Sequence, residues 1–150
     1  MARLLYRGIS TAQFIRHASA LVPKGAGPFY APALWDEFQW DGADWDGSER
    51  NAVVRHQWQQ RGLPTSGIST TPFRPRAEYY ATSGGKEPGG RVIVINRDLL
   101  APNGIREFVV ETYVPSPAVP EDSEVILVGP DGGILPQTIV VEILDWPPIA

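Results

Sequence analysis

The sequence predicts one domain with an α+β fold. Its 150 residues, 43% hydrophobic and 20% charged, match the size and composition of a single globular domain with its own core. Helical patterns fall mainly in the N-terminal half, whereas β-branched segments dominate the C-terminal half and end in a hairpin-like pair. Strands that follow one another without alternating helices are typical of an α+β fold, not of a doubly wound α/β fold.

Fifteen glycines and fifteen prolines divide the chain into short elements joined by many turns. The clearest strand covers 91–96, where four β-branched residues stand in a row. Gly8 is expected to halt the first strand, and residues 114–122, with their three prolines, to form a loop. Helices are expected at 10–21, 46–61 and 75–82, and strands at 3–7, 67–71, 91–96, 106–112, 124–128 and 137–144.

Local signals support the two N-terminal helices and the loop between them. Ser10 suits the N-cap of the first helix, and residues 46–49 resemble a capping box that opens the second. The expected buried side of the second helix comprises Ala52, Val53 and Trp58. Residues 23–47 hold six aromatic side chains, which predict an ordered loop that covers the core. The alternative is that this loop is a binding face for a partner or a sugar.

Composition excludes several classes of site. The absence of cysteine excludes disulfides, cysteine-ligated zinc, iron–sulfur clusters and a thiol nucleophile. His17 and His56 lack the spacing of a metal site, so no metal is expected, and His56 is interpreted as structural. A net charge of −4 argues against nonspecific binding of nucleic acid or anionic membranes. Without a signal-peptide pattern or an apolar run of spanning length, the chain is expected to be cytoplasmic, or secreted or injected into a target cell without a classical signal peptide, and not membrane-bound.

Three polar features lie at strand ends. Arg7 ends the first expected strand, three hydroxyl residues at 69–71 end a middle strand, and Glu124 opens a late strand. Arginine offers a fork of donors that suits a phosphate. A serine hydroxyl can hold a carboxylate in one rotamer, and a fixed carboxylate can stabilise positive charge that develops on a sugar ring. Together these residues are interpreted as one candidate site.

These residues resemble the motifs of the mono-ADP-ribosyltransferases of the Arg–Ser–Glu class, typified by bacterial toxins. The matching segments, in the family's order, are LYRG at 5–8, GISTT at 67–71 and DSEVIL at 122–127, followed by the turn VGPDGG at 128–133. The resemblance spans the start, middle and end of the chain. It implies two packed, mostly antiparallel β-sheets with NAD, the substrate, in the cleft between them.

The resemblance also implies roles for individual residues. Arg7, next to Gly8, would bind a phosphate or ribose of NAD, and Ser69 would orient Glu124. Glu124 would stabilise the oxocarbenium-like state as nicotinamide leaves. The remaining residues expected to bind or support NAD are Gly8, Thr70 and Thr71, with Phe73, Tyr79 and Tyr80 as candidates to stack on the nicotinamide. Residues 113–123 would form the loop that recognises the target.

One position departs from the family pattern. Asp122, also expected to be catalytic, stands where arginine-modifying members have Glu, and Glu121 is the alternative in another register. The acceptor therefore stays open, with a protein favoured over a nucleic acid, and an immunity or antitoxin protein is a further possible partner of such a toxin or effector. Two alternatives remain: an NAD glycohydrolase on the same fold, with water as acceptor, and a non-enzymatic interaction module that binds through its aromatic loop.

Overall fold

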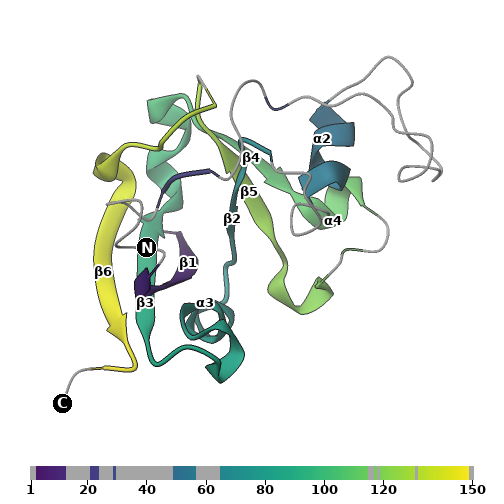
Figure 1. The fold of residues 1–150 in the computed structure, drawn as a ribbon. Helices are drawn as coiled ribbons and strands as arrows, with labels where there is room; N and C mark the ends of the chain where they lie inside the picture. The colour runs from purple at the N-terminus through teal and green to yellow at the C-terminus, as the bar shows by residue number, and fades with distance from the viewer. Residues whose placement is uncertain are drawn as a thin grey trace.

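The structure, a computed structural model, describes residues 3–12, 21–23, 29, 49–56, 65–114, 117, 119–130 and 132–148. Within these residues lie two three-stranded antiparallel β-sheets and a few short helices (Figure 1). The sequence prediction of an α+β fold is therefore confirmed. The predicted helix at 10–21 and the aromatic loop at 23–47 lie almost wholly outside the described residues, and both stay predictions.

The strands pair in two separate sheets. The first sheet has the order β1-β3-β6, with β1 at Leu4–Ser10, β3 at Gly90–Asn96 and β6 at Val140–Trp146. The second has the order β2-β5-β4, with β2 at Ile68–Thr70, β5 at Val125–Val128 and β4 at Arg106–Val109. Every pairing within them is antiparallel. The β-branched run expected at 91–96 is the central strand of the first sheet, since residues buried on both faces suit such side chains.

Among the described residues, the sheets are accompanied by the α-helices α2 at Glu49–His56, α3 at Arg74–Ala81 and α4 at Val110–Tyr113. The helix α3 begins two residues after Pro72 and carries Pro75 in its first turn, where a missing amide costs no hydrogen bond. The helix predicted at 46–61 is described only over α2, so its capping box and Trp58 lie outside the described residues. Short 3₁₀ turns cover Ser83–Gly85, Arg97–Leu99, Ala101–Asn103, Pro120–Asp122 and Gln137–Ile139.

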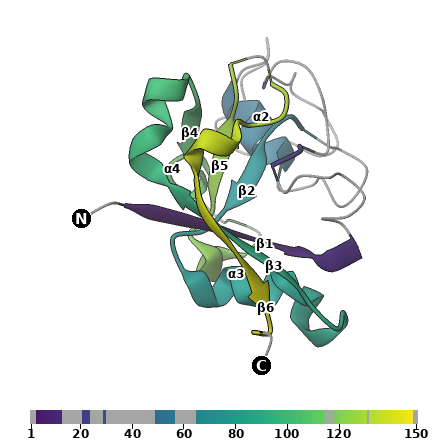
Figure 2. The same cartoon turned by 90° about the vertical axis from the view of Figure 1, so that its left-hand side faces the viewer.

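The buried apolar side chains of the described residues form three clusters. The largest joins side chains of β1 and β3, such as Leu5 and Ile95, to side chains of β2 and β5, such as Leu127, and so lies between the sheets. A second cluster packs α2 against β4 and β5 and includes Val53, which the sequence predicted to be buried. A third packs α3 against β3. The described layers therefore run from α3 through the first and second sheets to α2 (Figures 1 and 2).

A backbone bridge joins the two sheets. The amide of Tyr6 in β1 donates to the carbonyl oxygen of Thr71 at 2.8 Å, and the amide of Thr71 donates to the carbonyl oxygen of Tyr6 at 2.9 Å. Thr71 directly follows β2, so the predicted hydroxyl triplet ends at this junction. The bridge brings Arg7, the next residue of β1, beside the end of β2.

The prediction that Gly8 halts the first strand is wrong. The strand β1 continues to Ser10, and Gly8 pairs with Val92 in the ladder. A Cβ atom at Gly8 would lie 1.8 Å from the carbonyl oxygen of Ala77 in α3. The glycine is needed because the helix backbone packs directly on the strand, and its lack of a side chain does not end the strand.

Two later strands are shorter than predicted. The strand expected at 106–112 ends at Val109, and the residues that follow it form α4. Val109 pairs with Val125, the first residue of β5, so the ladder has no further partner, and the Val110 amide donates instead to the carbonyl oxygen of Glu124. The last strand begins at Val140, because residues 137–139 form a 3₁₀ turn after Pro136.

The contact between β1 and α3 gives a stability prediction. We expect Gly8→Ala to lower the free energy of unfolding by about 3 kcal/mol or more, since the new methyl group must displace the backbone of α3. Denaturant unfolding followed by circular dichroism measures this. Gly85→Ala is the control, because its φ of +94° strains an alanine by only about 1 kcal/mol and the described residues leave open space within 4 Å. Equal losses in the two variants would contradict the steric explanation.

Candidate functional site

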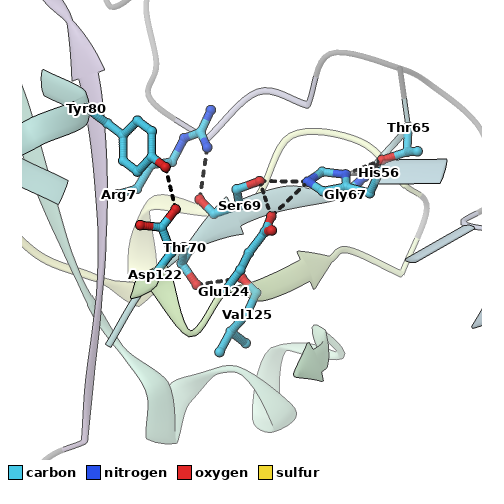
Figure 3. A network of polar contacts seen from close by, with 10 residues as sticks. All are labelled: Arg7, His56, Thr65, Gly67, Ser69, Thr70, Tyr80, Asp122, Glu124 and Val125. Atoms are coloured by element: carbon cyan, nitrogen blue, oxygen red, sulfur yellow. Dashed lines mark hydrogen bonds and ion pairs between the residues drawn. The ribbon is translucent and has the colours of Figure 1, made fainter. Parts of the chain in front are cut away.

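The three predicted motifs meet where the two sheets join (Figure 3). The guanidinium Nη1 of Arg7 donates to the carbonyl oxygen of Ser69 at 2.9 Å. Arg7 comes from the first sheet and Ser69 from the second, and 62 residues separate them in sequence. Their contact depends on the neighbouring bridge between Tyr6 and Thr71. The structure therefore brings together the arginine and the hydroxyl triplet.

The hydroxyl of Ser69 binds the carboxylate of Glu124. Its Oγ donates to Oε2 at 2.6 Å, a short charge-assisted hydrogen bond. The ladder between β2 and β5 explains the contact: Ser69 pairs with Ile126, so Glu124, two residues earlier, is a diagonal neighbour on the same face. The Glu124 side chain keeps 18% of its surface exposed. The carboxylate is thus fixed by the protein and still reachable from outside.

The other two hydroxyls of the triplet hold the backbone around Glu124. Thr70 Oγ1 donates to the carbonyl oxygen of Val125 at 2.7 Å, and Thr71 Oγ1 donates to that of Asp122 at 2.6 Å. Both threonines are buried. These bonds hold the backbone before and after Glu124. That Thr70 and Thr71 support the binding of NAD stays a prediction.

His56 belongs to the site, although its sequence context suggested only a structural residue. It is the last residue of α2 as described, and its side chain is 1% exposed. Its Nε2 lies 2.6 Å from Ser69 Oγ and 3.3 Å from Glu124 Oε2, and its Nδ1 lies 2.6 Å from Thr65 Oγ1. One sequence signal was present: His56 follows the buried pair Ala52 and Val53 by four and three residues, which puts it on the same face of the helix.

Asp122 is bound by the helix α3. Its Oδ1 accepts a hydrogen bond from Arg76 Nε at 2.6 Å, and its Oδ2 accepts one from the hydroxyl of Tyr80. The Arg76 guanidinium also stacks on the ring of Tyr79, 4.6 Å from its centroid. Nothing in the sequence pattern marked Arg76 as a partner, because its role depends on how α3 packs. The alternative acid, Glu121, is largely exposed and reaches Arg76 Nη2 only at 4.0 Å.

A left-handed residue separates the two carboxylates. Ser123 has φ 45° and ψ 50°, a conformation that few non-glycine residues adopt. In an extended strand the side chains of Asp122 and Glu124 would point to the same face. The turn at Ser123 instead aims Asp122 at Tyr80 and Glu124 at Ser69 and His56 (Figure 3). The predicted pair of acids therefore has two separate sets of partners.

Burial and charge set the protonation of two site residues. Burial lowers the pKa of Arg7 to about 10, and the nearby negative charge of Glu124 opposes that shift, so Arg7 is a cation at neutral pH. Burial raises the pKa of Tyr80 above its ordinary value, and its hydrogen bond to Asp122 raises it further. Tyr80 is therefore a neutral donor toward the Asp122 carboxylate.

The remaining predicted ligands lie on or under α3. Phe73 and Tyr79 are about half exposed, and Tyr80 is partly exposed with its hydroxyl on Asp122. Gly8 is covered by the backbone of Ala77. Stacking of the aromatic residues on nicotinamide and contact of Gly8 with NAD stay predictions. The close packing on α3 already accounts for a glycine at position 8.

Two further classes of feature are missing from the described part of the chain. No group of three acidic, histidine or cysteine side chains there is placed to hold a metal ion. None of the helices described is both long and apolar enough to cross a bilayer.

The shift at Tyr80 gives a prediction about pH. A raised pKa in the folded state means that the neutral phenol stabilises the fold fully below pH 10, and that this contribution is lost as pH rises through the folded-state value. Alkaline titration followed by the ultraviolet absorbance of phenolate should show one phenol that ionises late. This late step should be missing in Tyr80→Phe and retained in Tyr79→Phe. A late step that persists in Tyr80→Phe would contradict the assignment.

Comparison with known proteins identifies the family. A profile of the NarE family matches residues 4–127, a stretch that includes Arg7, Ser69 and Glu124. A search of curated proteins finds no match. The profile covers most of the chain, from the first residue of β1 into β5. The chain therefore belongs to the NarE family, a family of ADP-ribosyltransferases that use NAD as their substrate.

Proposed function

We propose that this protein is an NAD-dependent mono-ADP-ribosyltransferase of the Arg–Ser–Glu class. The observation that carries the proposal is the hydrogen bond from Ser69 Oγ to Glu124 Oε2, with Arg7 bound to the backbone of the same serine. An arginine, a serine and a glutamate from three distant segments form one connected group. The family membership supports the same activity.

Glu124 is the proposed catalytic residue. When the bond between the ribose C1′ and the nicotinamide nitrogen breaks, its electron pair stays with nicotinamide, and C1′ becomes oxocarbenium-like. A carboxylate fixed beside C1′ stabilises this positive charge without reorganising during the reaction. The acceptor then forms a new bond to C1′ and releases its proton. Ser69 keeps one carboxylate oxygen in place, and the partial exposure of Glu124 gives the ribose access.

Arg7 is proposed to bind the anionic part of NAD. Its guanidinium is a cation at neutral pH and is held at the junction of the sheets by the Ser69 carbonyl. Arginine suits a phosphate because its planar group offers several donors in a fixed fork. The positive charge of Arg7 also balances the negative charge of Glu124. The NAD molecule would therefore lie along the site with a phosphate or ribose at Arg7 and the nicotinamide ribose at Glu124.

The biological setting follows from the resemblance to bacterial toxins. We infer a toxin or effector that acts in the cytoplasm of the cell in which it is made or into which it is injected. Its acceptor is proposed to be a protein, and an immunity or antitoxin protein is a proposed second partner. Arg76 and Tyr80 bind Asp122, so its side chain does not indicate which residue type of the target protein is modified.

The first test removes the charge of Glu124. We expect Glu124→Gln to lower the rate of nicotinamide release from NAD by about 10²–10³-fold or more, because the amide keeps the shape and loses the charge that stabilises the transition state. Chromatography of the released nicotinamide measures the rate, and circular dichroism checks the fold. Glu121→Gln, a change at a largely exposed acid nearby, is the matched control. Equal turnover in wild type and Glu124→Gln would overturn the proposal.

The second test removes the hydroxyl that orients Glu124. We expect Ser69→Ala to lower kcat by roughly 10–100-fold, the equivalent of one charge-assisted hydrogen bond. The free energy of unfolding, followed through the melting temperature, should fall by less than the activation free energy rises. Ser66→Ala is the control, because Ser66 is buried nearby and its Oγ has no hydrogen-bond partner among the described residues. An unchanged kcat in Ser69→Ala would show that the Ser69 hydroxyl has no part in catalysis.

The third test identifies the acceptor. The protein is incubated with labelled NAD and a cell lysate, and the products are analysed by mass spectrometry. A modified protein in the lysate supports the transferase, whereas free ADP-ribose alone indicates an NAD glycohydrolase. If calorimetry detects no binding of NAD and a protein partner is captured through the aromatic loop, the results support a non-enzymatic interaction module and contradict the proposed enzyme.

A further inference from the structure

A continuous chain of hydrogen bonds runs through His56 to Glu124. It begins at the amide of Gly67, which donates to Thr65 Oγ1 at 3.2 Å. Thr65 Oγ1 lies 2.6 Å from His56 Nδ1, and His56 Nε2 lies 2.6 Å from Ser69 Oγ. The chain ends with the bond from Ser69 Oγ to Glu124 Oε2, also 2.6 Å long. After the first link, each hydrogen bond involves the ring of His56 or the Glu124 carboxylate (Figure 3).

The single hydroxyl proton of Ser69 fixes the direction of the two links that meet at its Oγ. Ser69 has one hydroxyl proton, which it donates to the Glu124 carboxylate. Its Oγ must therefore accept the hydrogen bond from His56, so the imidazole carries a proton on Nε2. At the other ring nitrogen, Thr65 accepts from the Gly67 amide and still has its own hydroxyl proton to donate to Nδ1. A neutral imidazole with the proton on Nε2 satisfies all four links.

We propose that His56 is a positioning residue, held as the neutral Nε2–H tautomer, that orients Ser69 and through it the Glu124 carboxylate. This inference rests on the proposed function for its effect on turnover. Every donor in the chain points toward the carboxylate, and hydrogen bonds that point the same way polarise one another. The Nε2–H group also lies 3.3 Å from Glu124 Oε2, so it restrains the same oxygen from a second direction.

The neutral state of the ring matters for the chemistry. A neutral imidazole restrains Glu124 and leaves its negative charge intact, whereas an imidazolium at 3.3 Å would form an ion pair with it. Such an ion pair would weaken the stabilisation of a positively charged ribose. Thr65 suits the neutral ring, because its hydroxyl can donate to an unprotonated Nδ1.

The sequence around Gly67 makes room for the ring. A Cβ atom at Gly67 would lie 3.3 Å from His56 Nδ1 and 2.4 Å from Ile126 Cγ2. The glycine therefore lets β2 and the end of α2 approach closely. Because His56 is 1% exposed and Thr65 8%, water does not compete for these hydrogen bonds. The fold thus holds the ring in one orientation.

The first experiment compares two amides at position 56. The side-chain nitrogen of Gln reaches the place of Nε2, while that of the shorter Asn does not. We expect His56→Asn to lower kcat by roughly 10–100-fold with the KM for NAD little changed, and His56→Gln to recover most of the loss. A residue that only supported the fold would show no such recovery. If the wild-type protein turns over NAD, the proposed function stands. Equal kcat in His56→Gln and His56→Asn would then overturn the inference about His56 alone.

The second experiment needs no enzymatic activity. The chain has two histidines, so nitrogen-15 NMR of the His17→Gln variant, labelled at histidine, reports His56 alone. We expect a protonated, pyrrole-like Nε2 and an unprotonated Nδ1 that accepts a hydrogen bond. Ser69→Ala should shift the Nε2 signal, and Ser66→Ala should leave it in place. The opposite tautomer, or an Nε2 signal unaffected by Ser69→Ala, would refute the inference even if the protein proved inactive toward NAD.

Discussion

The backbone bridge between Tyr6 and Thr71 is the contact on which the site depends. Each sheet is held together by its own ladder, and between the sheets the packing is largely apolar. Apolar packing is not directional and would tolerate small shifts of one sheet against the other. Two hydrogen bonds fix the register of β1 against the end of β2. Arg7 and Ser69, each within two residues of this bridge, are thereby held at a set separation.

The sequence predicted those features of the fold and site that local chemistry determines. A run of β-branched residues was enough to find the central strand at 91–96. The polar motifs singled out Arg7, Ser69 and Glu124, which the structure brings together, although Arg7 lies within β1 and not at its end. The features it missed depend on tertiary contacts. Gly8 was misread as a strand end because nothing local reveals that α3 packs on it. His56 and Arg76 were missed because their partners lie in other elements.

The site pairs its charged groups in a way that limits the cost of burying them. An isolated charge within a protein is expensive unless it is paired or hydrogen-bonded. Arg7 faces the charge of Glu124 and donates to a carbonyl oxygen, while Glu124 accepts from a hydroxyl. The imidazole of His56, proposed to be neutral, lies beside Ser69 and Glu124 and adds a polar group without adding charge. The second acid, Asp122, has its own cation in Arg76.

The left-handed turn at Ser123 has a consequence for how such a protein can diverge. Two acids only two residues apart would ordinarily share one environment, and a change in one would disturb the other. Here Asp122 binds α3 whereas Glu124 binds β2 and α2, because the left-handed backbone at Ser123 turns the two side chains apart. A lineage can therefore lengthen, shorten or neutralise the side chain at 122 and refit it against Arg76 and Tyr80, while the geometry of Glu124 is inherited unchanged.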